Sequence, residues 1–206
     1  PSKQYPLILE LHGGPHLAYG DFFSAEMQLM ASEGYIVFYD NYRGSASYGE
    51  DFALLLQGKY ASREDFQDHM SGIDHLIDRG FVDADNLFIC GGSAGGIGTA
   101  YAIGLTDRFN AAVAAKPVIN WISKTLTADS MVGQIYHQFP GPPWEHFEHY
   151  WKRSPLSLVG NVATPTLLLT GEEDRRTPMS ETEQFYQALR LRGVDSAMVR
   201  LPGASH

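Results

Sequence analysis

Short hydrophobic runs recur along this chain, separated by segments whose apolar residues have helical spacing. The runs are rich in aliphatic, β-branched and aromatic residues, and turn-forming residues follow each of them. We therefore expect strands at residues 7–11, 35–39, 87–90, 111–115, 166–170 and 197–201. Strands that alternate with helices predict a mostly parallel sheet with helices on both faces.

Two of the intervening segments carry clear helix signals. One places four apolar side chains along a single helical face that could cover a sheet, at Phe66, Met70, Ile73 and Ile77. In the other, Ser180 and Glu183 have the spacing of a capping box, and Gly193 follows the last periodic residue. A second helix should therefore run between Ser180 and Gly193.

The segment from about residue 121 to 160 breaks this alternation. It is rich in aromatic residues and proline, including Pro140, Pro142, Pro143, Trp144 and Trp151. We expect it to contain few or only short helices and to lie as an insertion over the edge of the sheet.

Composition and charge limit the classes of function. A length of 206 residues, with 44% hydrophobic and 19% charged residues, is typical of one globular domain. The net charge of -9, with no cluster of lysine and arginine, argues against a nucleic-acid or anionic-membrane surface. No apolar run approaches the roughly 20 residues that span a bilayer. The single cysteine, Cys90, fits a reducing compartment such as the cytoplasm, but a periplasmic location stays open.

A glycine-rich turn follows the expected strand at 87–90. Residues 91–96 read Gly-Gly-Ser-Ala-Gly-Gly, which fits the G-x-S-x-G nucleophile elbow, and a small-residue helix pattern comes next. A sharp strand-to-helix turn would push the hydroxyl of Ser93 into the open, so Ser93 is the candidate nucleophile. Alone, the motif would also fit a helix entry that binds phosphate or nothing. Cys90 next to it is expected to be structural.

A second glycine pair ends the first expected strand. His12 is followed there by Gly13, Gly14 and Pro15, at the place where an HGG-type loop offers backbone N–H groups to an oxyanion. We expect the N–H groups of Gly14 and Ala94 to form the oxyanion hole, and His12 to shape the loop. In isolation, the glycines could also form a tight turn without such a role.

A serine nucleophile needs a general base and an acid that orients the base. Asp174 comes just after the expected strand at 166–170, and His206 follows the strand at 197–201. The order Ser93, Asp174, His206 is the order found in α/β hydrolases. Glu172 and Glu173 are rival acids, although carboxylates in a loop are more often solvated.

Two further histidines, His146 and His149, stand near Glu145 and Glu148 with a spacing that could hold a metal ion on a helix. A solvated helix face is the favoured interpretation, because no further ligand motif supports a metal site. We therefore expect neither a metal ion nor another cofactor.

Together these motifs resemble the catalytic α/β-hydrolase domain of the prolyl oligopeptidase family of serine peptidases, and most of all its acylaminoacyl-peptidase branch. The similar segments are residues 12–15, 41–49, 91–96, 171–178 and 202–206. The resemblance implies that Arg176 binds a backbone carbonyl of the peptide. It also implies that Trp121 lines the pocket for the side chain before the cleaved bond. Alternatives are an ion pair of Arg176 with Glu172 or Glu173, and a core position for Trp121.

The resemblance also implies the domain organisation. Residues 1–206 are expected to be one catalytic domain truncated at both ends. Family members carry an upstream β-propeller, earlier strands and a helix after the histidine, and none of these is in this sequence.

The expected function is hydrolysis of short peptides through an acyl-enzyme on Ser93. A carboxylesterase could use the same three residues, because the triad does not select between amides and esters. A non-catalytic hydrolase-like binding domain is a third hypothesis, and the intact triad argues against it. The sequence leaves open whether the protein forms a homo-oligomer.

Overall fold

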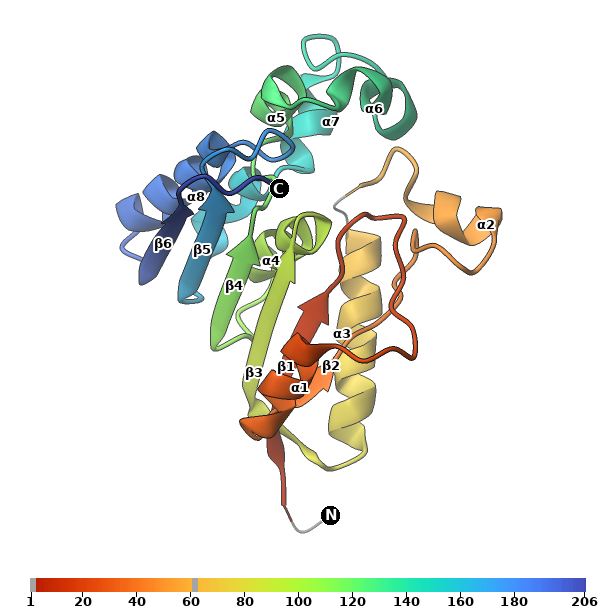
Figure 1. Cartoon of the computed structure of the whole chain (residues 1–206), viewed down its shortest axis with the longest axis vertical. Helices are drawn as coiled ribbons and strands as arrows, with labels where there is room; N and C mark the ends of the chain where they lie inside the picture. Colours follow the sequence, from red (N-terminus) through yellow and green to blue (C-terminus); the bar gives the residue numbers. More distant parts are fainter. Residues whose placement is uncertain (1–2, 61–62) are drawn as a thin grey trace.

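The computed structural model describes residues 3–60 and 63–206. Within these residues, six strands form one sheet in the order β2-β1-β3-β4-β5-β6, and every neighbouring pair is parallel (Figure 1). The strands are β1 (Tyr5–Leu11), β2 (Ile36–Phe38), β3 (Val82–Gly92), β4 (Ala111–Ala115), β5 (Thr166–Gly171) and β6 (Ser196–Leu201). The α/β class and the parallel sheet are thus confirmed.

Each expected strand overlaps an observed one, but β3 begins five residues earlier than the sequence predicts. Its first half is polar and contains two aspartates and an asparagine. Asp83 accepts hydrogen bonds from the N–H of Asp85 at 3.0 Å and from the side-chain amide of Asn86 at 2.8 Å. The carboxylate of Asp83 therefore bonds to a backbone N–H and a side-chain amide of its own strand, and no hydrophobic pattern marks this part as a strand.

Helices cover the two faces of the sheet unequally. The helices α3 (Arg63–Asp78), α4 (Ala94–Leu105) and α8 (Met179–Leu191) form one layer, and α1 (Ala25–Ser32) lies on the other face (Figure 1). Two short elements, α2 (Glu50–Ala53) and η1 (Leu54–Leu56), follow β2. The four apolar residues that predicted a helix after residue 63 do lie on α3 and pack against the core.

The main core lies between the sheet and the layer of α3, α4 and α8. In β1, Leu7, Leu9 and Leu11 are buried, whereas Ile8 and Glu10 between them are only partly buried. Alternate residues of a strand point to opposite faces of the sheet. The face of β1 toward α3, α4 and α8 is therefore buried, and the opposite face is partly exposed to solvent.

The segment that breaks the alternation forms three short helices and a 3₁₀ helix: α5 (Trp121–Thr127), α6 (Met131–Gln138), α7 (Phe147–Lys152) and η2 (Pro155–Asn161). Its helices α5, α6 and α7 lie beyond the carboxyl ends of the strands (Figure 1). Phe139 stacks on Tyr150 with ring centroids 4.2 Å apart and meets Trp121 edge-on at 5.1 Å. The aromatic residues of the segment thus build a second, smaller core next to α4.

The predicted capping box at Ser180 is wrong. Helix α8 begins at Met179, Pro178 occupies the N-cap position, and Ser180 is exposed inside the first turn. Proline has no side-chain acceptor, and no side-chain hydrogen bond caps this helix. Gly193 ends the helix as expected, with a φ of +73° that glycine adopts without strain.

The described residues contain no helix that combines the length and the apolar character needed to span a bilayer.

Helix α8 offers a matched test of the core. Leu189 is fully buried and Leu191, two residues later, is 88% exposed. We expect Leu189→Ala to lower the free energy of unfolding by about 2–5 kcal/mol, because it leaves a cavity in the core. Leu191→Ala should change it by less than about 0.5 kcal/mol. Urea unfolding of both variants measures the difference, and equal losses would contradict the packing of α8.

Candidate active site

Ser93 lies at the sharp turn between β3 and α4. Its φ of 59° and ψ of -116° fall in a region that residues other than glycine rarely adopt. Its N–H donates to the carbonyl of Ala115 at 2.9 Å, and its own carbonyl accepts from the N–H of Ile97 at 3.0 Å. Its hydroxyl does not cap α4. The backbone thus fixes the turn, and the hydroxyl points toward other groups.

Two glycines make this turn sterically feasible. A Cβ at Gly95 would overlap the carbonyl oxygen of Leu11, and a Cβ at Gly91 would lie 2.6 Å from the carbonyl carbon of Gly95. A side chain at Gly95 would push α4 away from β1, and one at Gly91 would push α4 away from β3. The glycines of the G-x-S-x-G motif therefore let the helix approach the sheet, which is the packing that the motif predicts.

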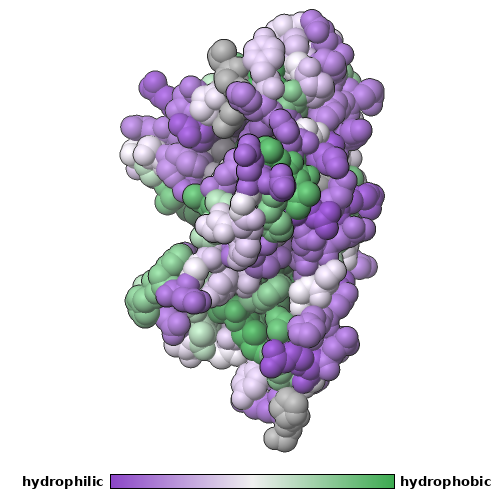
Figure 2. All heavy atoms as spheres, turned by 90° about the vertical axis from the view of Figure 1, so that its right-hand side faces the viewer, coloured by the Kyte–Doolittle hydropathy of each residue, from purple (hydrophilic) through white to green (hydrophobic). Residues whose placement is uncertain are grey.

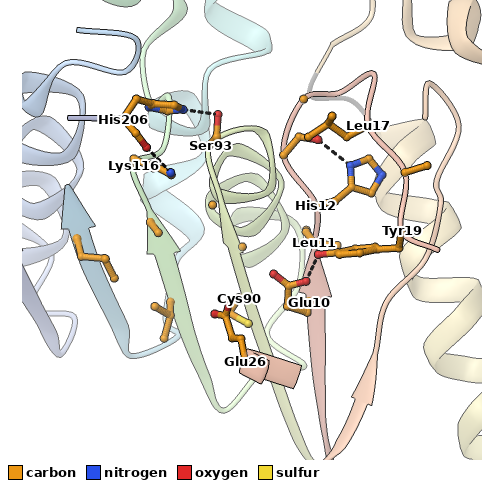
Figure 3. Close-up of a pocket in the computed structure, with 18 of the residues that line it drawn as sticks. Glu10, Leu11, His12, Leu17, Tyr19, Glu26, Cys90, Ser93, Lys116 and His206 are labelled. Atoms are coloured by element: carbon orange, nitrogen blue, oxygen red, sulfur yellow. Dashed lines mark hydrogen bonds between the residues drawn. The ribbon is translucent and has the colours of Figure 1, made fainter. Parts of the chain in front are cut away.

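His206 connects Ser93 to Asp174. Nε2 of His206 lies 3.0 Å from Oγ of Ser93, and Nδ1 lies 2.7 Å from Oδ2 of Asp174 (Figure 3 shows the first contact). If Nδ1–H donates to the carboxylate, Nε2 is free to accept the serine proton. The fold thus brings together three residues from the ends of β3, β5 and β6, although their catalytic roles stay a prediction.

The carboxylate of Asp174 is fully buried and held on both oxygens. Oδ1 accepts from the backbone N–H groups of Arg176 at 2.9 Å and Thr177 at 2.8 Å. Oδ2 accepts from the hydroxyl of Thr177 at 3.1 Å as well as from His206. These bonds leave the carboxylate one orientation, directed at the imidazole.

The rival acids occupy different surroundings. Glu172 and Glu173 are both exposed, and Glu172 pairs with Arg200 at 2.8 Å. The geometry therefore favours Asp174 over its two neighbours. Among the histidines that the structure describes, His206 is the one that hydrogen-bonds Ser93.

The loop after β1 is built around a buried imidazole. Nε2 of His12 lies 2.8 Å from the hydroxyl of Ser45, and Nδ1 lies 2.7 Å from the carbonyl of Gly13. The ring stacks on Tyr42 at a centroid distance of 4.5 Å. Burial lowers the pKa of His12, which favours the neutral ring. His12 thus ties the glycine loop to the loop after β2, as the sequence predicts for its shaping role.

An open cleft of about 710 Å³ lies in front of Ser93, on the partly open face of the sheet. In Figure 3, Glu10, Cys90 and Glu26 lie in the lower part of this cleft, and Ser93 and His206 lie at its upper end. Burial, followed by repulsion from Glu26, raises the pKa of Glu10 to about 7. Burial raises the pKa of Cys90 to about 12, so its thiol is protonated at neutral pH and is a poor nucleophile.

Apolar side chains border the open cleft. Figure 2 shows a hollow at one side of the molecule, with hydrophobic side chains gathered beside it. Leu17 and Phe22 line the cleft and are 55% and 64% exposed.

A smaller cavity of about 200 Å³, the inner pocket, also borders Ser93 and shares Gly14 and His206 with the open cleft. Its lining residues are Gly14, Tyr60, Ser93, Ala94, Ile97, Val118, Trp121, Lys124, Gln138, Arg176, Thr177 and His206. Both residues of the expected oxyanion hole, Gly14 and Ala94, therefore border the same cavity as Ser93. The inner pocket is the natural place for a group attached to the reacting carbonyl.

Both expected substrate-binding residues also line the inner pocket. Trp121 is 2% exposed, so it is at once part of the aromatic core and part of the pocket wall. Arg176 is exposed, and its Nε–H donates to Asp129 at 2.7 Å. Its ion pair is therefore with Asp129, and the alternative pairing with Glu172 or Glu173 is wrong. Their roles toward a substrate stay predictions.

The residues that the structure describes contain no group of three or more His, Cys, Asp or Glu arranged to hold a metal ion. Nε2 of His149 instead accepts a hydrogen bond from Nε–H of Arg153 at 3.1 Å. Burial, with further repulsion from Arg153, lowers the pKa of His149 to about 4.

Comparison with known proteins identifies the family. The model of the prolyl oligopeptidase family of peptidases matches residues 21–206. The chain belongs to the prolyl oligopeptidase family. It is 42% identical over 205 residues to an uncharacterized peptidase, YuxL, of Bacillus subtilis (strain 168), and 37% identical over 213 residues to the acylamino-acid-releasing enzyme of Arabidopsis thaliana.

A solved structure from this family supports the same assignment. The acylaminoacyl peptidase of Pyrococcus horikoshii superposes with a TM-score of 0.94 at 34% identity, over 99% of this chain and 34% of that one. The alignment with YuxL includes 98% of this chain but 31% of YuxL. The alignment with the Arabidopsis enzyme includes 100% of this chain but 28% of that enzyme. The chain therefore spans about a third of the length of these relatives.

Some residues of the site escape sequence reasoning. Thr177 contacts both Asp174 and, at 3.3 Å, Nδ1 of His206. Lys116, after β4, donates to the backbone carbonyl of His206 at 2.5 Å. Thr177 lies in the same loop as the candidate Asp174, so its hydroxyl could have been predicted as a hydrogen-bond donor to that carboxylate. No motif marks Lys116, because its contact depends on how β4 and the loop after β6 meet in space.

Asp174 and its neighbour Glu173 give a matched test of the acid. Asp174→Asn keeps the shape of the side chain but favours the wrong imidazole tautomer, and an equivalent change in a serine protease triad lowers kcat about 10⁴-fold. We expect a loss of this order for Asp174→Asn and less than about twofold for Glu173→Gln. Hydrolysis of a small activated ester measures both. A large loss in Glu173→Gln with a small one in Asp174→Asn would reverse the assignment.

Proposed function

We propose that the protein is a serine peptidase that hydrolyses short peptides through an acyl-enzyme on Ser93. The observation that carries this proposal is the hydrogen-bonded series from Ser93 through His206 to Asp174, with contacts of 3.0 and 2.7 Å, at the border of two cavities. Membership of a peptidase family, and similarity to enzymes named for release of acylated amino acids, support the peptide as substrate.

The reaction proceeds in two halves. Nε2 of His206 accepts the proton of Ser93 as Oγ attacks the peptide carbonyl, and the same imidazole then donates that proton to the leaving amine. In the second half, Nε2 of His206 takes a proton from water as the water oxygen attacks the acyl carbon. The imidazolium then donates that proton to Oγ of Ser93 as the bond between Oγ and the acyl carbon breaks, which releases the acid product and restores the enzyme. Asp174 stabilises the positive charge on the imidazole in both halves.

The negative charge that develops on the carbonyl oxygen is stabilised by the N–H groups of Gly14 and Ala94 in this proposal. Ala94 is the first residue of α4, so its N–H lacks an acceptor within the helix. Gly14 has a φ of +117°, and a Cβ there would lie 2.7 Å from the backbone nitrogen of His16. Glycine therefore permits the loop conformation that places this backbone beside Ser93.

Arg176 binds the backbone of the peptide in this proposal, while Trp121 lines the pocket for the side chain before the cleaved bond. A guanidinium carries five N–H donors, and the contact with Asp129 uses the one on Nε. Its remaining donors are available to a peptide carbonyl at the rim of the inner pocket. Trp121 supplies an apolar wall deeper in that pocket.

Labelling with a fluorophosphonate tests the nucleophile. We expect the wild-type protein and Cys90→Ala to be labelled at similar rates, and Ser93→Ala to remain unlabelled. The thiol of Cys90 is protonated at neutral pH, so its removal should not lower labelling. Equal labelling of wild type and Ser93→Ala would reject Ser93 as the nucleophile.

The neighbouring arginines test peptide recognition. Arg176→Ala should lower kcat/KM for a peptide p-nitroanilide about tenfold or more, because a hydrogen bond from a charged donor is lost. Hydrolysis of an acetyl ester, which lacks the carbonyl that Arg176 binds, should fall much less. Arg175→Ala is the control, since Arg175 is exposed and accepts a hydrogen bond from the N–H of Asp129 through its backbone carbonyl, which the substitution keeps. Equal losses on both substrates would leave Arg176 with a structural role, and ester turnover without peptide turnover would favour a carboxylesterase.

A further inference from the structure

The inner pocket contains a buried lysine. Lys124 lies on α5 one turn after Trp121, so both side chains occupy the same side of the helix. Lys124 is 4% exposed, and its Nζ is 5.7 Å from the centroid of the Trp121 ring. A lysine with so little exposure is unusual, because burial of an ammonium group is costly. Because Lys124 lines the inner pocket, its charge acts on a group that binds there.

The hydrogen-bonding groups at this pocket are complementary to an anion. Lys124 and Arg176 line it as cationic donors, and none of the lining residues in the described part of the chain has a side-chain carboxylate. The indole Nε1 of Trp121 is buried, with no hydrogen-bond partner among the described residues. A buried donor without a partner costs free energy, but the match of the pocket to an anion rests on the charges of Lys124 and Arg176.

The buried carboxylate of Glu181, which interacts electrostatically with Lys124, also holds α5 in place. Glu181 of α8 is fully buried and accepts from the N–H groups of Ile119 at 3.0 Å and Asn120 at 2.8 Å, and from the hydroxyl of Ser123 at 2.5 Å. These bonds fasten the start of α5 to α8. Glu181 therefore fixes the helix that carries Trp121 and Lys124, and a substrate meets a rigid pocket wall.

We propose that the inner pocket selects peptides with an acidic residue, glutamate above all, immediately before the cleaved bond, and that Lys124 binds its carboxylate. This inference rests on the proposed peptidase function and specifies its substrate class. A cavity of about 200 Å³ beside Ser93 has room for one side chain. A charged partner in a site shielded from water gives a strong and specific hydrogen bond.

The charges around Lys124 set the pH range of this selectivity. Burial, followed by repulsion from Arg176, lowers the pKa of Lys124 to about 8, while Glu181 of α8 and Asp129 after α5 act in the opposite direction. His206, after β6, lines the same pocket. Lys124 is therefore charged below about pH 8 and loses its charge above it, whereas a glutamate side chain stays ionised throughout this range.

The test uses the full-length protein and three p-nitroanilide substrates of sequence acetyl-Ala-Ala-Xaa, where Xaa is Glu, Gln or Leu. Glutamine matches glutamate in shape without its charge, so the ratio of their kcat/KM values cancels any common change in the catalytic residues. We expect the wild type to prefer Glu over Gln about tenfold or more at pH 7. Lys124→Met should reduce the ratio to about one or below.

Lys152→Met is the control, because Lys152 is exposed on α7 and does not line the inner pocket. It should keep the wild-type ratio. If Lys124→Met fails to fold, the wild type alone still decides, since its Glu preference should decline as the pH rises through about 8.

The outcomes separate the two proposals. A Glu to Gln ratio near one in the wild type, a preference for Leu, or an unchanged ratio in Lys124→Met would overturn the acidic selectivity while leaving the peptidase function intact. Cleavage of none of the three substrates would overturn the peptidase function together with this inference.

Discussion

The turn at Ser93 is the constraint on which the rest of the site depends. A residue other than glycine is held there at a φ of 59°, which is tolerated because β3, α4 and the neighbouring carbonyl of Ala115 fix the backbone around it. The same turn places Ser93 at the border of the open cleft and the inner pocket. Strands β5 and β6 run parallel to β3 and end at the same edge of the sheet, with β4 between β3 and β5, so the loops after them bring Asp174 and His206 to Ser93.

Buried polar groups hold the loops around this turn. His12 joins the glycine loop to Ser45, two backbone N–H groups fix the carboxylate of Asp174, and Glu181 fastens α5 to α8. The contacts of His12 and Glu181 join elements that are distant in sequence, whereas those of the Asp174 carboxylate hold its own loop. An active site requires such rigidity, because displacement of a catalytic group by about 1 Å can cost about 10²-fold in rate. Glu181 holds the start of α5, and α5 carries the pocket residues Trp121 and Lys124.

The fold was predictable to a large extent, because parallel strands appear as short apolar runs and the elbow has a specific motif. The polar first half of β3 was missed since no hydrophobic pattern marks it and the carboxylate of Asp83 bonds within its own strand. The capping box at Ser180 was wrong because a proline starts the helix instead. Motifs predicted which residues would meet in the triad. Partners such as Asp129, Lys116 and Lys124 carry no local signal, and only the packing of distant loops places them.

The central claim is that Ser93 carries the acyl group. Mass spectrometry of protein quenched in acid during hydrolysis of a slowly deacylating p-nitrophenyl ester tests it most directly. The tryptic peptide of residues 80–108 contains both Ser93 and Cys90, and fragmentation distinguishes them. We predict an acyl adduct on Ser93 that disappears after prolonged incubation as water releases it. An adduct on Cys90, or turnover without any adduct on this peptide at any time, would contradict the account.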